Sequence, residues 1–470
     1  MNTKTTVISE EALAQQLAFC DKIEAYWKSQ AITPTAYVET YGCQQNEADS
    51  QRIRGILQSA GYAITDGPEG ADVVVMNTCA IREHAEQRVF GNLGALTHTK
   101  RRHPAQKIFL CGCMAGQSVV TDRLKKSYPH VDGVFSTHHL WQFPEILYRV
   151  LNQKKRLFYI EDEAGSIAEG LPILRDNQLK AWVSIMYGCN NFCTYCIVPY
   201  VRGRERSRKI EDILAECREL IENGCKEITL LGQNVNSYGK DLDEGNDFAD
   251  LLDAICQIPG EFLVRFMTSH PRDAGHKLFD TMARNPKVAK QLHLPFQSGS
   301  SRVLKAMNRH YDREKYLEAV NYAKSVMPDL VLTSDVIVGF PGESEAEFEQ
   351  TISLIEQVRY DALFTFIFSP RPGTPAADME DPTPKDEKNR RFDKLCAVQN
   401  AISEQIHAGY VGKTFRCLVD GMDKDMLTAR TEGGRLVRFA GDESLIGTYQ
   451  ELTITGSNTW SLTGTLACAN

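Results

Sequence analysis

The pattern of apolar and polar positions divides the chain into three regions. Residues 10–30 carry apolar positions at helical spacing, which predicts a peripheral helix that ends before Pro34. From Thr35, short apolar runs alternate with helical patterns, for example at residues 47–60 and 83–96. This alternation is typical of a parallel sheet with helices on its faces. The strands expected in this first α/β domain are residues 36–40, 73–77, 107–110 and 131–135.

A second α/β series follows a charged connector without a clear period. Its helical patterns, such as residues 209–223 and 346–358, fall between six apolar runs. Six strand–helix units in succession predict a second parallel α/β domain. The strands expected there are residues 182–186, 227–231, 263–268, 291–296, 332–338 and 363–368.

The texture of the sequence changes again after Gly409. Short apolar runs alternate with turns that contain Gly and Asp, which predicts a small antiparallel β-barrel. Its expected strands are residues 414–419, 427–431, 436–439, 448–455 and 461–466. The full expected order is a helical extension (1–34), a first α/β domain (35–151), a linker (152–173), a second α/β domain (174–405) and the barrel (406–470).

Size and composition agree with this division. A chain of 470 residues exceeds the size of one hydrophobic core, so two or three domains are expected. Residues 1–10 contain no apolar run, and no segment has the length and hydrophobicity to span a membrane. We therefore expect a cytoplasmic protein without membrane contact. The 14 cysteines then point to metal or redox chemistry rather than to disulfides.

One cysteine cluster has the spacing CxxxCxxC, formed by Cys189, Cys193 and Cys196. Three thiolates on one loop can hold three irons of a four-iron cluster and leave the fourth iron open. The loop follows an expected strand, and the C-terminal ends of strands form the catalytic end of α/β barrels. A structural zinc site is the alternative, but such sites close with four ligands, and no second cysteine pair follows at the usual distance.

A second cysteine set is dispersed over the first α/β domain. Cys43, Cys79 and Cys113 each follow an expected strand. In a parallel sheet the C-terminal strand ends share one edge, so these three thiols are expected to converge. Each could instead be a small buried residue, which is common for a free cysteine. Three cysteines in equivalent places favour a second three-thiolate iron–sulfur cluster.

Cys111 lies two residues before Cys113, so in an extended strand both side chains would point to the same face. We predict that Cys111 is not a ligand, because a fourth thiolate would close the open iron. The remaining cysteines are expected to be structural: Cys20, Cys217, Cys225, Cys256, Cys396, Cys417 and Cys468.

Polar and Gly-containing motifs end three strands of the second domain. They are Gly232-Gln-Asn234, Gln297-Ser-Gly-Ser300 and Gly339-Phe-Pro-Gly342. Glycine permits close backbone approach to a ligand, and amide side chains both donate and accept hydrogen bonds. Ser300 is expected to cap a helix. The candidate cofactor-binding residues are Tyr195, Gly232, Gln233, Asn234, Ser298, Gly339 and Gly342.

The net charge gives no sign of nucleic-acid binding. Lys and Arg number 53 against 61 Asp and Glu, a balance of −8. Any attraction to an anionic partner must therefore come from local patches. One basic cluster follows the CxxxCxxC loop closely and is the candidate RNA-binding patch, although pairing of these side chains with nearby carboxylates is an equal alternative. It contains Arg202, Arg204, Arg206 and Arg208.

Together these motifs resemble those of the radical S-adenosylmethionine (SAM) methylthiotransferase family. The resemblance covers nearly the whole chain from Thr35 and rests on Tyr41-Gly-Cys-Gln44, Asn77-Thr-Cys-Ala-Ile-Arg-Glu83, Leu231-Gly-Gln-Asn-Val-Asn236, Ala376-Ala-Asp-Met379 and the CxxxCxxC loop with Tyr195. It implies an N-terminal cluster domain, a central partial (β/α)6 barrel and a C-terminal RNA-binding TRAM barrel. It also implies two 4Fe–4S clusters, held by Cys43, Cys79 and Cys113 and by Cys189, Cys193 and Cys196.

The resemblance further implies two SAM molecules per turnover. One would methylate a sulfur at the N-terminal cluster, and the other would be cleaved reductively at the barrel cluster to a 5′-deoxyadenosyl radical. The product would be a 2-methylthio derivative of an isopentenylated adenosine beside the tRNA anticodon. The implied partners are that anticodon stem-loop and an electron-donor protein, and we expect a monomer. No catalytic residue beyond the cluster ligands is assigned.

Three other functions remain open at this point. Family members that act on a ribosomal-protein aspartate tend to carry proline after the first cysteine, where this chain has Gln44. Members that act on threonylcarbamoyl-adenosine in tRNA differ less decisively in the same loop. A non-catalytic RNA-binding iron–sulfur sensor needs only one cluster, so it leaves three of the six ligand-type cysteines without a role.

Overall fold

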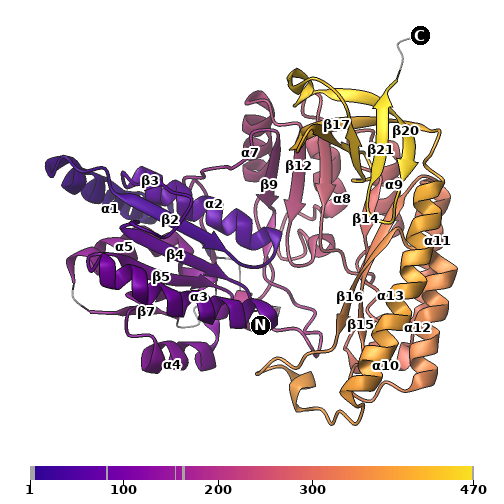
Figure 1. The fold of residues 1–470 in the computed structure, drawn as a ribbon, viewed down its shortest axis with the longest axis horizontal. Coiled ribbons are helices and arrows are strands. Elements are labelled where there is room, and N and C mark those ends of the chain that lie inside the picture. The colour runs from indigo at the N-terminus through magenta and orange to yellow at the C-terminus, as the bar shows by residue number, and fades with distance from the viewer. Residues whose placement is uncertain (1–5, 81–82, 154, 161–164, 468–470) are drawn as a thin grey trace. The chain divides into compact units, whose positions relative to one another are not determined.

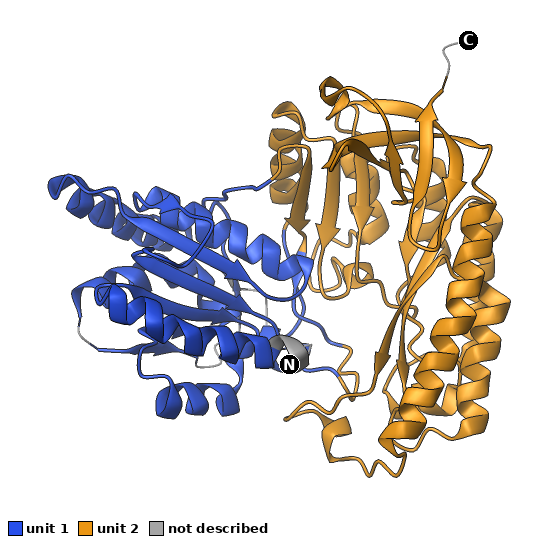
Figure 2. Ribbon diagram, in the orientation of Figure 1, with its two compact units in different colours: residues 1–176, 186–190, 196–208 blue, residues 177–185, 191–195, 209–470 orange. Residues whose placement is uncertain are grey.

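The computed structural model describes residues 6–80, 83–153, 155–160 and 165–467. The chain forms two compact units (Figure 2). Unit 1 contains residues 1–176, 186–190 and 196–208, and unit 2 contains residues 177–185, 191–195 and 209–470. Cys468 lies outside the described residues. Within the described part of the chain, no helix has the length and hydrophobicity needed to cross a membrane.

Unit 1 is built on a six-stranded parallel sheet of order β3-β2-β4-β5-β6-β7 (Figure 1). Its central strand β4 is buried along its whole length, as its apolar sequence VVVMNT requires. The order reverses between β2 and β4, which makes the C-terminal edge there a topological switch point, the usual place for a ligand. The strands are β2 (Thr35–Thr40), β3 (Ala63–Ile64), β4 (Val73–Thr78), β5 (Lys107–Gly112), β6 (Gly133–Phe135) and β7 (Leu157–Tyr159).

Helices cover both faces of this sheet and bury two apolar clusters against it. Helix α1 was expected to be peripheral, but its residues Cys20 and Ile23 belong to one of these clusters. Ser9 accepts a hydrogen bond from the Ala12 amide and so caps the start of α1. The helices are α1 (Glu10–Ser29), α2 (Gln44–Ser59), α3 (Glu83–Arg102), η1 (Met114–Gly116), α4 (Ser118–Ser127), η2 (Thr137–Gln142) and α5 (Phe143–Asn152).

The segment expected as a linker contributes structure to unit 1. Strand β7 pairs with β6 and extends the sheet. Strand β8 (Ser166–Ile167) pairs in parallel with β1 (Thr6–Val7). Both pieces are only two or three residues long, too short for their apolar residues to show a period. The chain later returns to unit 1 with β10 (Met186–Tyr187), α6 (Val198–Arg202) and β11 (Arg206–Ser207).

Unit 2 contains six parallel strands in two sheets of order β13-β12-β9 and β14-β15-β16. An isolated parallel bridge from Val288 to Val264 of β13 links the sheets just before β14. The six βα units of the second α/β domain are therefore present, as predicted. The strands are β9 (Lys180–Ser184), β12 (Glu227–Leu231), β13 (Leu263–Phe266), β14 (Gln291–His293), β15 (Val331–Val338) and β16 (Ala362–Ile367).

Helices alternate with these strands, and several begin with the caps that their sequences predict. Ser300 accepts a hydrogen bond from the Val303 amide, so its expected capping role is confirmed. Ser344 and Glu347 form a capping box. The helices are α7 (Ile210–Glu222), η3 (Val235–Ser237), α8 (Phe248–Cys256), α9 (His276–Arg284), α10 (Ser301–Ala306), α11 (Arg313–Val326), α12 (Glu345–Val358), η4 (Pro375–Asp378) and α13 (Lys385–Ala408).

The C-terminal part of unit 2 is a closed five-stranded barrel of order β17-β18-β19-β21-β20. The barrel was predicted to be antiparallel, but β19 and β21 pair in parallel, so it is mixed. Short η5 (Glu443–Leu445) and strand β20 separate these two strands in the sequence, which allows them to run in the same direction. The strands are β17 (Thr414–Asp423), β18 (Met426–Thr431), β19 (Leu436–Phe439), β20 (Tyr449–Ser457) and β21 (Leu462–Leu466).

Candidate functional site

Cys43, Cys79 and Cys113 follow the C-terminal ends of β2, β4 and β5, three adjacent parallel strands. Cys43 precedes the first turn of α2, and Cys113 precedes η1. The predicted convergence at one sheet edge is therefore present in unit 1. It lies where the strand order reverses between β2 and β4.

The backbone brings the thiols together closely. Gly42 has a φ of 130°, and a Cβ there would lie 2.5 Å from Cys79 Cβ and 3.1 Å from Cys79 Sγ. Only glycine fits this approach. Burial raises the pKa of the Cys113 thiol to about 12; the Arg202 guanidinium opposes this rise, and the nearby Cys79 and Cys43 thiols add to it. The three sulfurs are thus electrostatic neighbours in a site with little solvent.

Two asparagines connect the loops that carry these thiols. The Cys43 thiol donates to Asn46 Oδ1 at 3.4 Å, and Asn46 Nδ2 donates to the Thr78 carbonyl at 2.9 Å. Asn77 Nδ2 donates to the Asn46 carbonyl at 2.8 Å. Both asparagines stand in the sequence motifs around the cysteines, and no role was predicted for either. Their position near the C-terminal end of β4 and in the first turn of α2, three residues or fewer from a cysteine, is the signal that identifies them.

Arg202 reaches the same thiols from a distant part of the sequence. Its Nε donates to Cys113 Sγ at 3.0 Å, and its Nη2 donates to Asp49 Oδ2 at 2.9 Å. Burial lowers the pKa of this guanidinium, but the Cys113, Asp49 and Cys43 groups outweigh burial and hold the pKa well above its usual value. Arg202 therefore stays charged although only 4% of it is exposed.

A closed hairpin carries Arg202 to this position. Met186 and Tyr187 of β10 pair with Ser207 and Arg206 of β11, so the residues between the two strands form one long loop that is closed at its base. The Cys189 amide donates to the Gly203 carbonyl at 3.1 Å, and the Asn190 amide donates to Glu205 Oε1 at 3.1 Å. Helix α6 lies within this loop. Ile197, which precedes α6, and Val201, which lies in it, form a buried cluster with Ala80 and Cys113.

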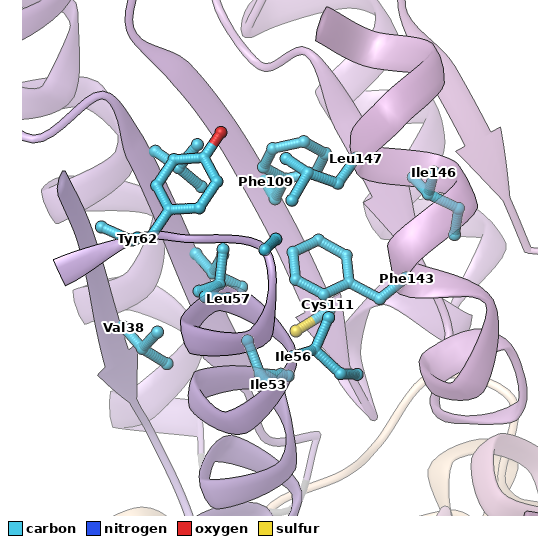
Figure 3. Close-up of a cluster of buried hydrophobic side chains, with 14 of the residues drawn as sticks. Val38, Ile53, Ile56, Leu57, Tyr62, Phe109, Cys111, Phe143, Ile146 and Leu147 are labelled. Carbon is cyan, nitrogen blue, oxygen red and sulfur yellow. The ribbon is translucent and has the colours of Figure 1, made fainter. Parts of the chain in front are cut away.

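Cys111 has a different environment from Cys113. It lies in the apolar cluster with Ile53, Ile56 and Phe143 (Figure 3). The two cysteines were expected to share a strand face, but Gly112 has a φ of 93° and ends the extended conformation. Cys113 consequently turns toward Ala80 and α6. Burial raises the pKa of the Cys111 thiol well above its usual value.

Replacement of Cys111 by alanine is expected to leave both iron–sulfur clusters in place. The variant loses one buried sulfur from an apolar cluster, at a stability cost near that of one methylene, about 1 kcal/mol. Iron analysis and thermal unfolding of the anaerobically reconstituted protein check this prediction. A variant that binds half the iron of the parent protein would show instead that Cys111 is a ligand.

Unit 2 holds the middle of the CxxxCxxC loop against the C-terminal end of α10. The Thr194 amide donates to the Met307 carbonyl at 3.1 Å, and Asn308 Nδ2 donates to the Phe192 carbonyl at 3.0 Å. Arg309, which is 5% exposed, directs Nη1 to Cys193 Sγ at 3.5 Å. Tyr195 packs against an apolar cluster that contains Met307, Phe340 and Phe368.

The candidate SAM-binding residues of unit 2 follow C-terminal strand ends. Gly232, Gln233 and Asn234 follow β12, Ser298 follows β14, and Gly339 and Gly342 follow β15. At these ends, after β13 and in the CxxxCxxC loop, several buried polar atoms have no hydrogen-bond partner among the described residues, a pattern that fits a polar ligand. They are Asn191 Oδ1, Asn234 Oδ1, Asn236 Nδ2, Ser269 Oγ, His270 Nε2 and Gln297 Oε1.

Two of the candidate SAM-binding residues, Gly339 and Ser298, also stabilise the local fold. Gly339 has a φ of 70°, and a Cβ there would lie 2.7 Å from Lys388 Cγ. Its amide donates to Glu343 Oε2 at 2.8 Å, which fixes the turn after β15. Ser298 Oγ accepts a hydrogen bond from the Ser300 amide at 3.2 Å. Contact of these residues with SAM stays a prediction.

Three of the four arginines predicted to bind RNA are buried. The exposed fractions of Arg202, Arg206 and Arg208 are 4%, 8% and 5%, whereas Arg204 is exposed. Arg206 Nη1 donates to the Arg204 carbonyl at 2.8 Å, and Arg208 forms two hydrogen bonds of 2.7 Å with Glu169. Pairing with carboxylates, the alternative weighed from the sequence, is found for Arg202 with Asp49 and for Arg208 with Glu169, whereas Arg206 donates to backbone carbonyls. RNA contact stays a prediction, and Arg204 is its best candidate.

Cluster binding by the two cysteine sets stays a prediction. A four-iron cluster binds each thiolate at a different iron, so three cysteines can hold three of its four irons. Each set consists of three cysteines, and in each one a buried arginine donates to a cysteine sulfur.

Three family models match successive parts of the chain. The "Uncharacterized protein family UPF0004" matches residues 35–136, which contain Cys43, Cys79 and Cys113. The "Radical SAM superfamily" matches residues 183–355, which contain the CxxxCxxC loop, and so favours a cluster over zinc there. The "TRAM domain" matches residues 409–467, the mixed barrel. A radical SAM domain implies SAM and one 4Fe–4S cluster.

Known proteins resemble the chain over nearly its whole length. It is 47% identical over 470 residues, 98% of each chain, to a tRNA-2-methylthio-N(6)-dimethylallyladenosine synthase from Acetivibrio thermocellus. It is 51% identical to a synthase of the same name from Clostridium perfringens, over 91% of this chain and 96% of that one. A solved radical SAM methyltransferase, TsrM from Kitasatospora setae, shares the fold alone, with a TM-score of 0.54, 12% identity, and 74% and 75% of the two chains covered. The chain therefore belongs to the radical SAM methylthiotransferase family, in the branch of the tRNA-2-methylthio-N(6)-dimethylallyladenosine synthases.

Proposed function

We propose that this protein adds a methylthio group to carbon 2 of an isopentenylated adenosine beside the anticodon of tRNA. The near-complete alignment with synthases of that name, at about half identity, carries this proposal. The arrangement of the cysteines supports it, because the reaction needs one site that activates the substrate carbon and another that supplies sulfur. Gln44 follows Cys43 in place of the proline that members acting on ribosomal protein tend to have.

The proposed enzyme holds two 4Fe–4S clusters and uses two SAM molecules in each turnover. Cys189, Cys193 and Cys196 hold one cluster, and Cys43, Cys79 and Cys113 hold the other. When bound, the first supplies an electron for cleavage of SAM, and the second supplies a site for the sulfur to be transferred. In each set three thiolates would leave one iron of a bound cluster without a protein ligand. Cys111 does not fill that position in unit 1, because its thiol is buried in the apolar core.

The residues around the N-terminal thiols orient the loops that carry these thiols and exclude water from them. Asn46 and Asn77 fix the loops after β2 and β4 relative to each other. Ile197 and Val201 cover Cys113 with apolar surface. In unit 2, the polar atoms left unpaired at the strand ends, such as Asn234 Oδ1 and Gln297 Oε1, are suited to bind the polar groups of SAM.

The proposal includes partners and a location. The substrate is a tRNA anticodon stem-loop, and the TRAM barrel of residues 409–467 supports RNA binding. Reaching the target base requires the base to leave its stack. A reductive reaction requires an electron-donor protein, and we propose that the enzyme works as a monomer in the cytoplasm, where tRNA is found.

Mass spectrometry of tRNA nucleosides from a deletion strain tests the proposed function. The strain is expected to accumulate isopentenyladenosine without the 2-methylthio group, and expression of this chain should restore the modification. Normal 2-methylthio-isopentenyladenosine in the strain would overturn the proposal. Loss of methylthio-threonylcarbamoyl-adenosine, or of methylthio-aspartate in ribosomal protein, would point to the alternative substrates.

Replacement of Arg204 by alanine is expected to weaken tRNA binding and to reduce the dependence of the binding constant on salt concentration. One lost phosphate contact lowers the slope of log K against log salt by about 1. Binding of an isopentenylated anticodon stem-loop across a salt series measures this slope. The control is Arg284→Ala, which removes an equal charge from the end of α9. The Arg284 side chain is 53% exposed, pairs with Asp253 and lies near the N-terminal ends of the strands. An Arg204→Ala slope equal to that of the parent would place the RNA surface elsewhere, such as on the TRAM barrel.

A further inference from the structure

We propose that Arg202 is a positioning residue of the N-terminal iron–sulfur site, which donates a charged hydrogen bond to Cys113 and raises the reduction potential of the cluster bound there. This inference rests on the proposed function in one respect, namely that Cys113 is a cluster ligand. It extends the N-terminal site beyond residues 35–136, the range of the matching family model, to a helix that follows the CxxxCxxC loop.

The geometry of the Arg202 guanidinium is specific to this sulfur. Nε lies 3.0 Å from Cys113 Sγ, while Nη2 is 2.9 Å from Asp49 Oδ2 and 3.4 Å from Asn46 Oδ1. Asn46 in turn accepts a hydrogen bond from the Cys43 thiol. The guanidinium therefore contacts one cysteine sulfur, that of Cys113, directly. All five residues of this network are in unit 1.

The path of the chain makes this contact rigid. Helix α6 ends at Arg202, and Gly203 follows with a φ of 73°, which turns the chain back toward the hairpin. The Val201 carbonyl accepts a hydrogen bond from Thr137 Oγ1 at 3.1 Å, and Val201 packs on Cys113. A guanidinium held by packing on one side and by Asp49 on the other keeps its orientation without a cost in side-chain entropy when the cluster binds.

The charges around Arg202 favour a net positive environment for the thiolates. Asp49 is the carboxylate that pairs with Arg202, and it is also 3.7 Å from Arg52 Nη1. Gln45 Nε2 donates to Asp49 Oδ1 at 3.2 Å. Two arginines thus share one carboxylate. Because Arg202 and Asp49 are both nearly inaccessible to solvent, their fields are poorly screened.

The expected direction of the effect follows from charge. Reduction adds an electron to the cluster and increases the negative charge on its cysteine sulfurs. A buried N–H donor with a full positive charge stabilises that extra charge and so raises the potential, one of the known controls on iron–sulfur clusters. A buried carboxylate nearby has the opposite effect. Arg202 and Asp49 should therefore act on the potential with opposite signs.

The test uses the full-length chain with Cys189, Cys193 and Cys196 replaced by alanine, so that the N-terminal cluster is the only one present. Arg202→Met, Arg202→Lys and Asp49→Asn are made in this background, together with the control Arg54→Met. Arg54 lies on the same helix as Asp49 and pairs with Asp176 at 2.7 Å. The midpoint potential is measured by redox titration followed by electron paramagnetic resonance, and iron content is measured in parallel.

Arg202→Met is expected to shift the midpoint to lower potential, and Arg202→Lys to shift it less in the same direction. Asp49→Asn should shift it to higher potential, while Arg54→Met leaves it unchanged. A structural role would not give opposite signs. If Arg202→Met loses its iron, the signs for Arg202→Lys and Asp49→Asn decide the question. Equal potentials in the parent, Arg202→Lys and Asp49→Asn would overturn the inference, whereas a background protein without any cluster would overturn the proposed cluster ligands themselves.

Discussion

Replacing Cys189, Cys193 and Cys196 together by alanine is expected to abolish reductive cleavage of SAM, while iron for one cluster remains bound. These thiols lie within a single loop at the end of β9 and β10, in the region that matches the radical SAM superfamily. The other three cysteines lie at the ends of β2, β4 and β5, so their cluster does not depend on this loop for ligands. Formation of 5′-deoxyadenosine with a chemical reductant, measured by mass spectrometry, should fall to the level without enzyme.

The matched control replaces Cys217, Cys225 and Cys256, three other buried thiols of unit 2. Cys217 lies within α7, Cys225 precedes β12, and Cys256 ends α8, so all three are remote from the C-terminal strand ends. This variant should keep both clusters and cleave SAM. Formation of 5′-deoxyadenosine at the parental rate by the loop variant would contradict the assignment of the two cysteine sets.

The positions of the three N-terminal cysteines after parallel strands were predicted from the sequence, while their role as cluster ligands stays a prediction. Cys43, Cys79 and Cys113 are far apart in the sequence, yet each follows a run of apolar residues that a parallel sheet requires. Parallel strands place their C-terminal ends at one edge, which is the basis of the predicted convergence, but the adjacency of β2, β4 and β5 was known only from the structure. The close approach of Gly42 to Cys79 could not be predicted, because it depends on the exact twist and register of β2 and β4.

The role of the arginines was the main point that the sequence did not reveal. A run with four arginines in seven residues is typical of an exposed basic patch, yet Arg202, Arg206 and Arg208 are buried. The partners of Arg202 and Arg208, which are Asp49, Cys113 and Glu169, are distant in sequence, and no local pattern identifies such pairs. A short helix between a Cys-containing loop and a two-residue strand was also too brief to show amphipathic periodicity.

Short pairings account for the remaining differences in the fold. Strands β7 and β8 have three and two residues, so they lack the length over which a period can be recognised. The parallel pairing of β19 with β21 depends on barrel closure, which joins strands that are not consecutive. Alternation of apolar residues is the same in parallel and antiparallel strands of a barrel, so the pattern alone could not distinguish them.

Replacing Cys43, Cys79 and Cys113 together by alanine is expected to separate SAM cleavage from sulfur transfer. The variant should still form 5′-deoxyadenosine, because the CxxxCxxC loop is intact, but it should yield no methylthiolated tRNA. The fold of unit 1 should persist, because Arg202 keeps its pairing with Asp49 and Asn46. Of the three replaced cysteines, only Cys113 belongs to an apolar cluster, the small one beside α6.

The decisive measurement is the ratio of the two products in one reaction with isopentenylated anticodon stem-loop. In the parent protein, 5′-deoxyadenosine and 2-methylthio-isopentenyladenosine should form together. In the N-terminal variant the first should remain and the second should be absent, with iron for one cluster bound. Methylthiolated product at the parental level would mean that the three thiols at the ends of β2, β4 and β5 do not take part in sulfur transfer. Loss of both products with both clusters missing would mean that the two sites are not independent. Because the loops after β2 and β4 are joined by Asn46 and Asn77 rather than by the thiols alone, we expect independence.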